Sequence, residues 1–132
     1  MQKTTSLYEI IYVSTLALHA PISSVGEIAG KSRAANRRRD ITGLLIFDGS
    51  RFCQQLEGPR REVIRLLDHI RMDARHTDVE VIYDGELNER RFQNFGLGYC
   101  PTEADDALAH LEKLDGQAAL DAFVKLLDVV DL

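Results

Sequence analysis

The stretch RFCQQLEGP at residues 51–59 has the composition of a strand that ends at a Gly-Pro pair, and it carries a glutamine at an apolar position. Side chains of a strand point alternately to its two faces, so Phe52, Gln54 and Leu56 share one face. If that face is buried, the Gln54 amide needs hydrogen-bond partners, because a buried amide without them costs about 1–3 kcal/mol. Gln54 is therefore a candidate binding residue that offers both a donor and an acceptor.

Three further polar residues lie on apolar faces. Tyr12 lies in an apolar strand, Asn36 continues the apolar stripe of a helix, and Asp73 ends the stripe of a second helix. Each has a structural alternative: Tyr12 as a core tyrosine bonded to a carbonyl, Asn36 as a helix terminator, and Asp73 as the partner of Arg71 or Arg75. Together with the glutamine, these groups predict a pocket for a flat, largely apolar ligand with polar edges.

The elements that must position these residues follow from apolar periodicity and turn signals. The predicted order is strand, helix, two strands, helix, two strands. The strands are expected at 7–14, 79–87 and 92–100 and as a hairpin within 41–58, and the helices after Pro21 and at 59–73. This order predicts an α+β, ferredoxin-like sheet with one extra strand and two helices on one face.

Both faces of this predicted sheet are apolar, and such a sheet needs cover on both sides. Two further amphipathic helices, expected at 103–115 and 117–131, supply it either by folding back over the sheet or by packing against another subunit. We therefore expect residues 1–100 to form the main domain and residues 101–132 a helical extension of the same globular unit. The apolar tail helices also favour a homodimer.

The composition bounds the function further. The chain has 132 residues, of which 45% are hydrophobic, and a net charge of −5, which argues against general affinity for nucleic acid. The basic cluster of Lys31, Arg33, Arg37, Arg38 and Arg39 is either a solvated helix end or a site for a phosphate group. No metal-binding spacing, signal peptide or membrane-spanning run is present, so we expect a soluble, cytoplasmic protein without a metal site.

Five segments in order resemble the successive signatures of BLUF domains, the blue-light sensors that use flavin. They are YEIIYVS, RAANRRRDITGLLIFD, RFCQQLEGPRREV, MDARHTDVEVI and RRFQNFGLGY. The similarity runs in register from about Leu7 to Tyr99. It implies the ferredoxin-like fold, with a flavin ring lying between the two helices, so residues 1–100 are expected to be the flavin-binding domain.

The resemblance also implies roles for individual residues. The photoactive tyrosine of the family falls on Tyr12, its switching glutamine on Gln54, and the asparagine that contacts the pyrimidine edge of the flavin on Asn36. The other residues expected to bind the ring, the ribityl chain or the phosphate are Lys31, Ser32, His69, Asp73, Arg75 and His76. FAD is the expected flavin, with FMN or riboflavin as alternatives.

The chain departs from the family pattern at three positions. Ala35 stands where many members carry a histidine or asparagine, Leu97 where many carry a methionine, and Phe95 where some carry a tryptophan. Leucine offers no sulfur and phenylalanine no side-chain hydrogen bond. Two of the three differing residues, Phe95 and Leu97, are also the residues expected to transmit the signal.

The resemblance implies a photoreceptor rather than an enzyme. Excitation is expected to draw an electron and then a proton from Tyr12, after which Gln54 rotates or tautomerises and the flavin absorption shifts to the red. The output is expected through an unknown downstream protein or a change in self-association. An acylphosphatase-type enzyme is disfavoured, because STLALHAP at 14–21 lacks the glycine and arginine of a phosphate loop. A ferredoxin-like small-molecule-binding or dimerisation module without photochemistry is the remaining alternative.

Overall fold

The computed structural model describes residues 7–21, 23–99 and 107–130, except for the side chains of residues 31–35 and 99. Its strands are β1 (Leu7–Leu16), β2 (Thr42–Phe47), β3 (Arg51–Pro59), β4 (His76–Leu87) and β5 (Phe95–Tyr99). Its helices are α1 (Ser24–Arg38), α2 (Arg60–Met72), α3 (Ala107–Leu111) and α4 (Gly116–Leu126). The order of the first seven elements is the one that the sequence predicts.

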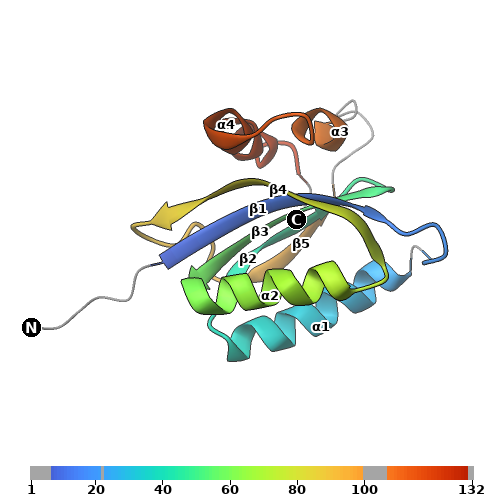
Figure 1. Ribbon diagram of the computed structural model, residues 1–132, viewed down its shortest axis with the longest axis horizontal. Helices are drawn as coiled ribbons and strands as arrows, with labels where there is room; N and C mark the ends of the chain where they lie inside the picture. Colours follow the sequence, from blue (N-terminus) through green and yellow to red (C-terminus); the bar gives the residue numbers. More distant parts are fainter. Residues whose placement is uncertain (1–6, 22, 100–106, 131–132) are drawn as a thin grey trace, which may run out of the picture.

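The strands form one five-stranded sheet in the order β4-β1-β3-β2-β5 (Figure 1). The pairs β4–β1, β1–β3 and β3–β2 are antiparallel, and β5 joins β2 in parallel. Strands β4, β1, β3 and β2, together with α1 and α2, make the ferredoxin-like arrangement. The extra strand is β5, at the edge next to β2. The predicted α+β fold class is therefore confirmed.

Helices α1 and α2 cover one face of the sheet (Figure 1). Helix α1 contacts β2 and β5, whereas α2 contacts β1, β3 and β4, so the two helices lie over different strands. Phe52 and Leu56 of β3 are buried in this layer, as the alternation of RFCQQLEGP predicts. Tyr12 of β1 is buried in the same layer, which fixes the phase of a strand whose two faces are both apolar.

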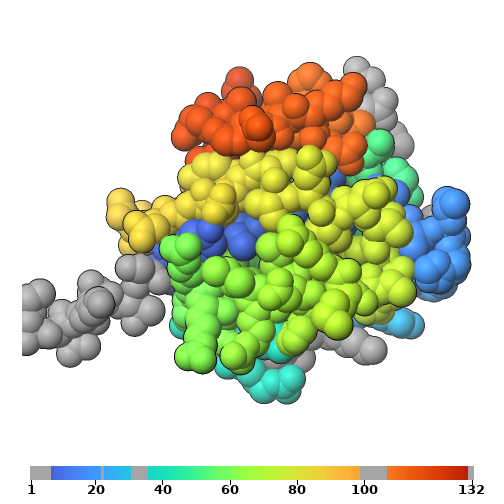
Figure 2. All heavy atoms as spheres, in the orientation of Figure 1, coloured from blue at the N-terminus to red at the C-terminus, as the bar shows by residue number. Residues whose placement is uncertain are grey.

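Helices α3 and α4 cover the opposite face of the sheet, and Figure 2 shows them seated over β4. Their buried side chains Leu108, Leu111, Leu120 and Phe123 pack with Ile11, Val13, Leu44, Ile46 and Cys53 of the sheet. Of the two predicted arrangements of the tail, folding back over the sheet is the one observed. The apolar faces of these helices are buried within the chain, so they no longer argue for a homodimer. Residues 103–106 and 131 of the predicted tail helices lie outside the described residues.

The ladder between β1 and β4 contains two register shifts, one between Ile11 and Tyr12 and one between Val13 and Thr15. Such β-bulges bend a strand and redirect the side chains beside them, and they are frequent next to functional sites. Here the shifts flank Tyr12 and Ser14, both on the face that α1 and α2 cover. Within the described residues, no helix is long and apolar enough to span a membrane.

Candidate functional site

Tyr12 and Gln54 lie directly opposite each other on neighbouring strands β1 and β3. The Tyr12 hydroxyl donates a hydrogen bond to Oε1 of Gln54, and both residues are buried. Burial raises the pKa of the Tyr12 phenol well above its ordinary value of 10.0, and the charges of Cys53 and Asp73 act in the same direction. Tyr12 is therefore a protonated donor at neutral pH, and its bond is to a side-chain amide rather than to a backbone carbonyl.

Asn36 is fully buried, and neither Nδ2 nor Oδ1 of its side chain has a hydrogen-bond partner among the residues that the structure describes. Asn36 does not terminate α1, its alternative role. The helix ends after Arg38, and the left-handed conformation that often follows a helix is taken by Asp40, with a φ of 62°. The backbone carbonyl of Asn36 accepts bonds from the amides of Arg39 and Ile41, which leaves the side chain unused. A buried amide of this kind is costly unless a ligand supplies the missing partners.

Asp73 pairs with Arg75 at the end of α2, as its structural alternative predicts. Nη2 of Arg75 donates to Oδ2 of Asp73 at 2.8 Å, and Nε and the backbone amide of Arg75 donate to Oδ1 at 3.0 and 2.9 Å. These bonds lower the pKa of the Asp73 carboxyl from 3.8 to about 2 against the effect of burial. The pair is half-buried, so Arg75 is held in place near the site with part of its guanidinium exposed.

His76, the first residue of β4, is buried beside the Tyr12–Gln54 pair. The His76 ring lies edge-on to the Tyr12 ring, with the ring centroids 6.4 Å apart. It also packs against the Phe52 ring, with a centroid distance of 4.7 Å. Nδ1 of His76 lies 3.0 Å from the hydroxyl of Ser14, which is fully buried. Burial lowers the pKa of His76, so the imidazole is neutral near pH 7. The sequence reasoning did not assign Ser14, although its position two residues after Tyr12 places both on one face.

The other predicted site residues are placed less centrally. His69 is exposed on α2, with Nδ1 3.5 Å from a guanidinium nitrogen of Arg39. Phe95 is buried and Leu97 half-buried on β5, both in the layer under α1 and α2. Strand pairing places Leu97 beside Leu45 and Leu45 beside Gln54, so one cross-strand row joins β5 to the glutamine. The side chains of Lys31 and Ser32 lie outside the described residues.

A second polar cluster, called the carboxylate cluster below, lies on the opposite face of the sheet and was not predicted. Glu9 and Glu57 are fully buried and face each other across β1 and β3. Nε of Arg91 donates to both carboxylate oxygens of Glu9, at 2.8 and 3.2 Å. Glu57 accepts bonds of 2.7 to 3.0 Å from Thr42 Oγ1, Gln55 Nε2 and the backbone amides of Arg91 and Phe92. This cluster ties the segment before β5 to the sheet.

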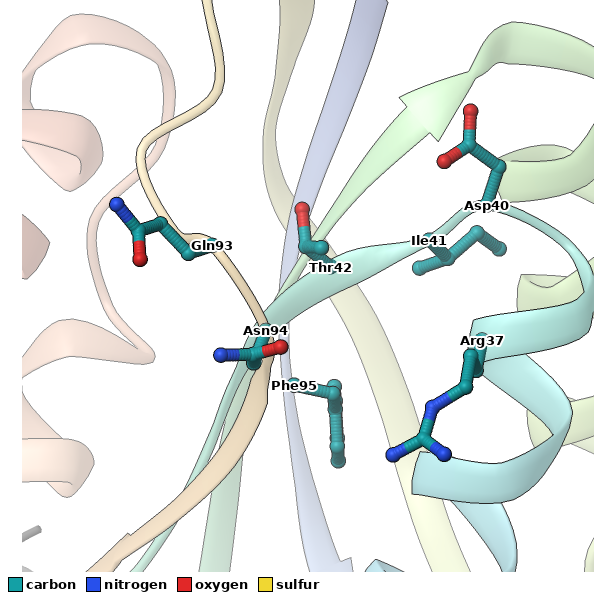
Figure 3. A pocket seen from close by; sticks show the side chains of 7 residues that line it. All are labelled: Arg37, Asp40, Ile41, Thr42, Gln93, Asn94 and Phe95. Carbon is teal, nitrogen blue, oxygen red and sulfur yellow. The ribbon is translucent and has the colours of Figure 1, made fainter.

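A surface pocket of about 400 Å³ opens between the end of α1 and the starts of β2 and β5 (Figure 3). Among the described residues it is lined by Arg37, Asp40, Ile41, Thr42, Gln93, Asn94 and Phe95, of which only Phe95 belongs to the predicted site. Its side chains Arg37, Gln93 and Asn94 are exposed, so water satisfies them and they require no ligand. The buried Asn36 amide, rather than this pocket, marks the candidate binding site.

Comparison with known proteins assigns the family. The BLUF family, described as "Sensors of blue-light using FAD", matches residues 7–98. The chain is 32% identical over 91 residues to the blue light- and temperature-regulated antirepressor BluF of Escherichia coli (strain K12). It is 34% identical over 86 residues to the photoactivated adenylate cyclase subunit beta of Euglena gracilis. These matches cover 69% and 65% of this chain but only 23% and 10% of the two relatives.

The structure is also similar to the dark-state structure of BlrB, a BLUF protein, with a TM-score of 0.76 and 26% sequence identity. That match covers 95% of this chain and 97% of BlrB. The chain therefore belongs to the BLUF family of flavin-binding blue-light sensors. The buried, unpartnered Asn36 amide and the Tyr12–Gln54 pair fit a flavin, whose polar edge carries both hydrogen-bond donors and acceptors.

Proposed function

We propose that this protein is a blue-light photoreceptor in which Tyr12 and Gln54 perform the light-driven step beside a bound flavin. The observation that carries the proposal is the buried hydrogen bond from the Tyr12 hydroxyl to Gln54 Oε1. A phenol bonded to an amide is a donor that can lose its proton without water, because the acceptor is already in place. The unpartnered amide of Asn36 supports a ligand at the same layer of the sheet.

The residues divide the proposed photocycle between them. A flavin, when bound, absorbs blue light and in its excited state is a strong oxidant. Tyr12 gives up an electron and then the proton on its hydroxyl oxygen, and both return to Tyr12 at the end of the cycle. Gln54 rotates or tautomerises while Tyr12 is deprotonated, which changes the hydrogen bonds that its amide offers to the polar edge of the ligand. The changed hydrogen bond shifts the absorption to the red, and no substrate is consumed.

Asn36 is proposed to bind the pyrimidine edge of the flavin through its buried amide, and His76 to lie beside the ring. The half-buried Arg75, with Asp73, is proposed to bind the ribityl chain and phosphate. Lys31, Ser32 and His69 are proposed to support the same side. An arginine held by a carboxylate is a suitable phosphate ligand, since its remaining guanidinium donors keep a fixed direction. This favours FAD or FMN over riboflavin, and FAD is the flavin we propose.

Absorption spectra test the proposal. Purified protein loaded with FAD is expected to show a reversible red shift of its blue absorption band on illumination, which decays in the dark. Tyr12→Phe and Gln54→Leu should each bind flavin and lose the shift, because one removes the transferable proton and the other the rotating amide. Tyr8→Phe is the matched control: Tyr8 is bonded to Asp84 rather than to Gln54, so its loss should leave the shift intact. A full red shift in Tyr12→Phe would contradict the proposed mechanism.

The output is proposed to pass through β5 to a separate protein or to a change in self-association. Leu97 is two places along the cross-strand row from Gln54, with Leu45 between them. A change at Gln54 therefore reaches β5 through apolar packing, without the sulfur contact that a methionine would offer. Size-exclusion chromatography in the dark and under blue light tests the self-association: a constant elution volume would leave a separate partner as the output.

A further inference from the structure

The contact between Ser14 and His76 joins β1 to the first residue of β4 inside the buried layer. Oγ of Ser14 and Nδ1 of His76 are 3.0 Å apart, Ser14 is fully buried, and His76 is 7% exposed. The same imidazole is edge-on to the Tyr12 ring at 6.4 Å with an interplanar angle of 74°. The orientation of His76 thus sets one wall of the space around Tyr12.

The β-bulge in β4 is what brings His76 to this face. Val13 pairs with Glu80 and Thr15 with Thr77, so two residues of β4 lie opposite the single residue Ser14. One of the two, Asp78, takes the left-handed conformation with a φ of 53°. The shift places His76 opposite Leu16. In an unshifted ladder His76 would lie one residue further along β1, and a slip of one residue turns a side chain to the other face of a sheet.

We propose that Ser14 is a positioning residue of the photoactive site, which acts on the Tyr12–Gln54 pair through His76. The Ser14 hydroxyl fixes Nδ1 of the imidazole toward β1, while Phe52 holds the ring from the side at 4.7 Å. These two contacts hold the imidazole in the orientation that places Nδ1 beside the Ser14 hydroxyl. Tyr12 therefore keeps a defined neighbour while its hydrogen bond to Gln54 is broken and remade. This inference rests on the proposed function and adds a residue to it.

The hydroxyl of Ser14 is a hydrogen-bond partner of His76, and two charged side chains also act on the imidazole. Asp73 and Arg75 influence its pKa in opposite directions, Asp73 raising it and Arg75 lowering it, but both are engaged with each other. A buried imidazole nitrogen that loses its hydrogen bond is penalised, so removal of the hydroxyl favours rotation of the ring. The effect of Ser14 is therefore expected to appear at Nδ1 first and at Tyr12 second.

The pair Ser14→Thr and Ser14→Val tests the proposal, since the two side chains have the same shape and only threonine keeps the hydroxyl. The first measurement is the ¹⁵N NMR resonance of His76 Nδ1 in protein without flavin. We expect Ser14→Thr to keep the wild-type position, whereas Ser14→Val moves the resonance or splits it into two ring orientations. An unmoved Nδ1 resonance in Ser14→Val would overturn the proposed hydrogen bond.

The second measurement is the lifetime of the red-shifted state in flavin-loaded protein. We expect the lifetime in Ser14→Val to be about threefold to tenfold shorter than in Ser14→Thr, the range that one net hydrogen bond corresponds to. A looser neighbour lowers the barrier for Tyr12 and Gln54 to return to their dark arrangement. Lifetimes that are equal, or longer in Ser14→Val, would overturn the positioning role even if Nδ1 responds. Absence of any red shift in the wild type would instead refute the proposed function, and the Nδ1 result would still decide the hydrogen bond.

Discussion

Polar side chains are buried on both faces of the sheet, but the two faces differ in whether the protein supplies their hydrogen-bond partners. On the face under α3 and α4, Glu57 accepts four hydrogen bonds and Glu9 is paired with Arg91. On the face under α1 and α2, the amide of Asn36 on α1 is equally buried, and within the described part of the chain neither its nitrogen nor its oxygen has a partner. The two carboxylates of the first face thus have hydrogen-bond partners within the chain, whereas the Asn36 amide on the second face has none among the described residues.

This difference separates structural from functional burial of polar groups. A buried polar residue alone says little, because most such residues are satisfied by the protein itself. What indicates a binding site is a buried group that the fold keeps unsatisfied at a cost. By this criterion Asn36 is the strongest candidate for a binding residue, whereas the two acids of the carboxylate cluster are satisfied by the protein. Gln55 is intermediate, since its Nε2 donates to Glu57 while its buried Oε1 has no partner among the residues described.

The largest expected effect comes from breaking the carboxylate cluster. Glu57→Ala leaves the donors of Thr42, Gln55, Arg91 and Phe92 without their acceptor, so we expect the free energy of unfolding to fall by about 3–5 kcal/mol. Urea denaturation of the flavin-free protein measures this loss. Glu57→Gln is the matched control, because it keeps the shape and one acceptor oxygen, and it should lose less. Equal losses in the two variants would mean that the acceptor oxygens of Glu57 do not matter.

The reverse pattern is expected on the other face. Asn36→Leu removes an unsatisfied amide from a buried helix position, so the flavin-free protein should become more stable, by about 1–2 kcal/mol. The same variant should bind flavin at least about tenfold more weakly, because the ligand loses its hydrogen bonds to the amide. Urea denaturation and flavin titration measure the two effects, with Glu57→Gln as the control that loses stability but keeps its affinity. A loss of stability in flavin-free Asn36→Leu would place Asn36 with the structural residues.

Local sequence signals predicted the parts of the fold that local chemistry decides. The hairpin at Asp48-Gly49-Ser50 forms as expected, with Oδ1 of Asp48 accepting a bond from the amide of Ser50. The alternation of β3 correctly placed Gln54 among buried residues, and the resemblance chose the correct phase for Tyr12. These features depend on periods of two residues and on turn types, which a single segment carries.

The features that the sequence did not predict depend on contacts between distant segments. Arg91 donates hydrogen bonds to Glu9, which lies 82 residues earlier in the sequence. The alternation of β1 predicts only that Glu9 shares a face with Ile11 and Val13. Strand β4 begins at His76, three residues before the predicted start at residue 79. This start depends on a bulge in which Asp78 takes the left-handed conformation, and the sequence of this segment looks like that of a loop. The alternation rule assumes an unbroken ladder, so it fails where a bulge shifts the register.

A smaller effect should appear in the pH dependence of stability through Glu9. Burial raises the pKa of Glu9 above 4.5 in the folded protein, although Arg91 opposes the shift. The folded state then holds the proton more tightly than the unfolded chain. The stability that Glu9 contributes is therefore present below pH 4.5 and is lost as the pH rises through the folded-state pKa. Urea denaturation of the wild type and Glu9→Gln should show a difference that declines as the pH rises from 4 to 7. A difference that grows with pH would show that Arg91 outweighs burial.

The smallest effect is expected for the Asp73–Arg75 pair, which satisfies itself as the carboxylate cluster does but lies on the side of the ligand. Hydrogen bonds from Arg75 lower the pKa of Asp73 from 3.8 to about 2, so the stability it contributes is present above pH 3.8 and disappears as the pH falls through about 2. Because the pair is half-buried, Asp73→Asn should cost only about 0.5–1 kcal/mol at pH 7. Thermal unfolding of the flavin-free wild type and Asp73→Asn between pH 2 and 7 measures this difference. If the stability difference between the wild type and Asp73→Asn does not shrink below pH 3.8, the ion pair with Arg75 does not contribute to stability. Asp73 would then resemble Asn36, a buried polar residue whose proposed partner is the flavin.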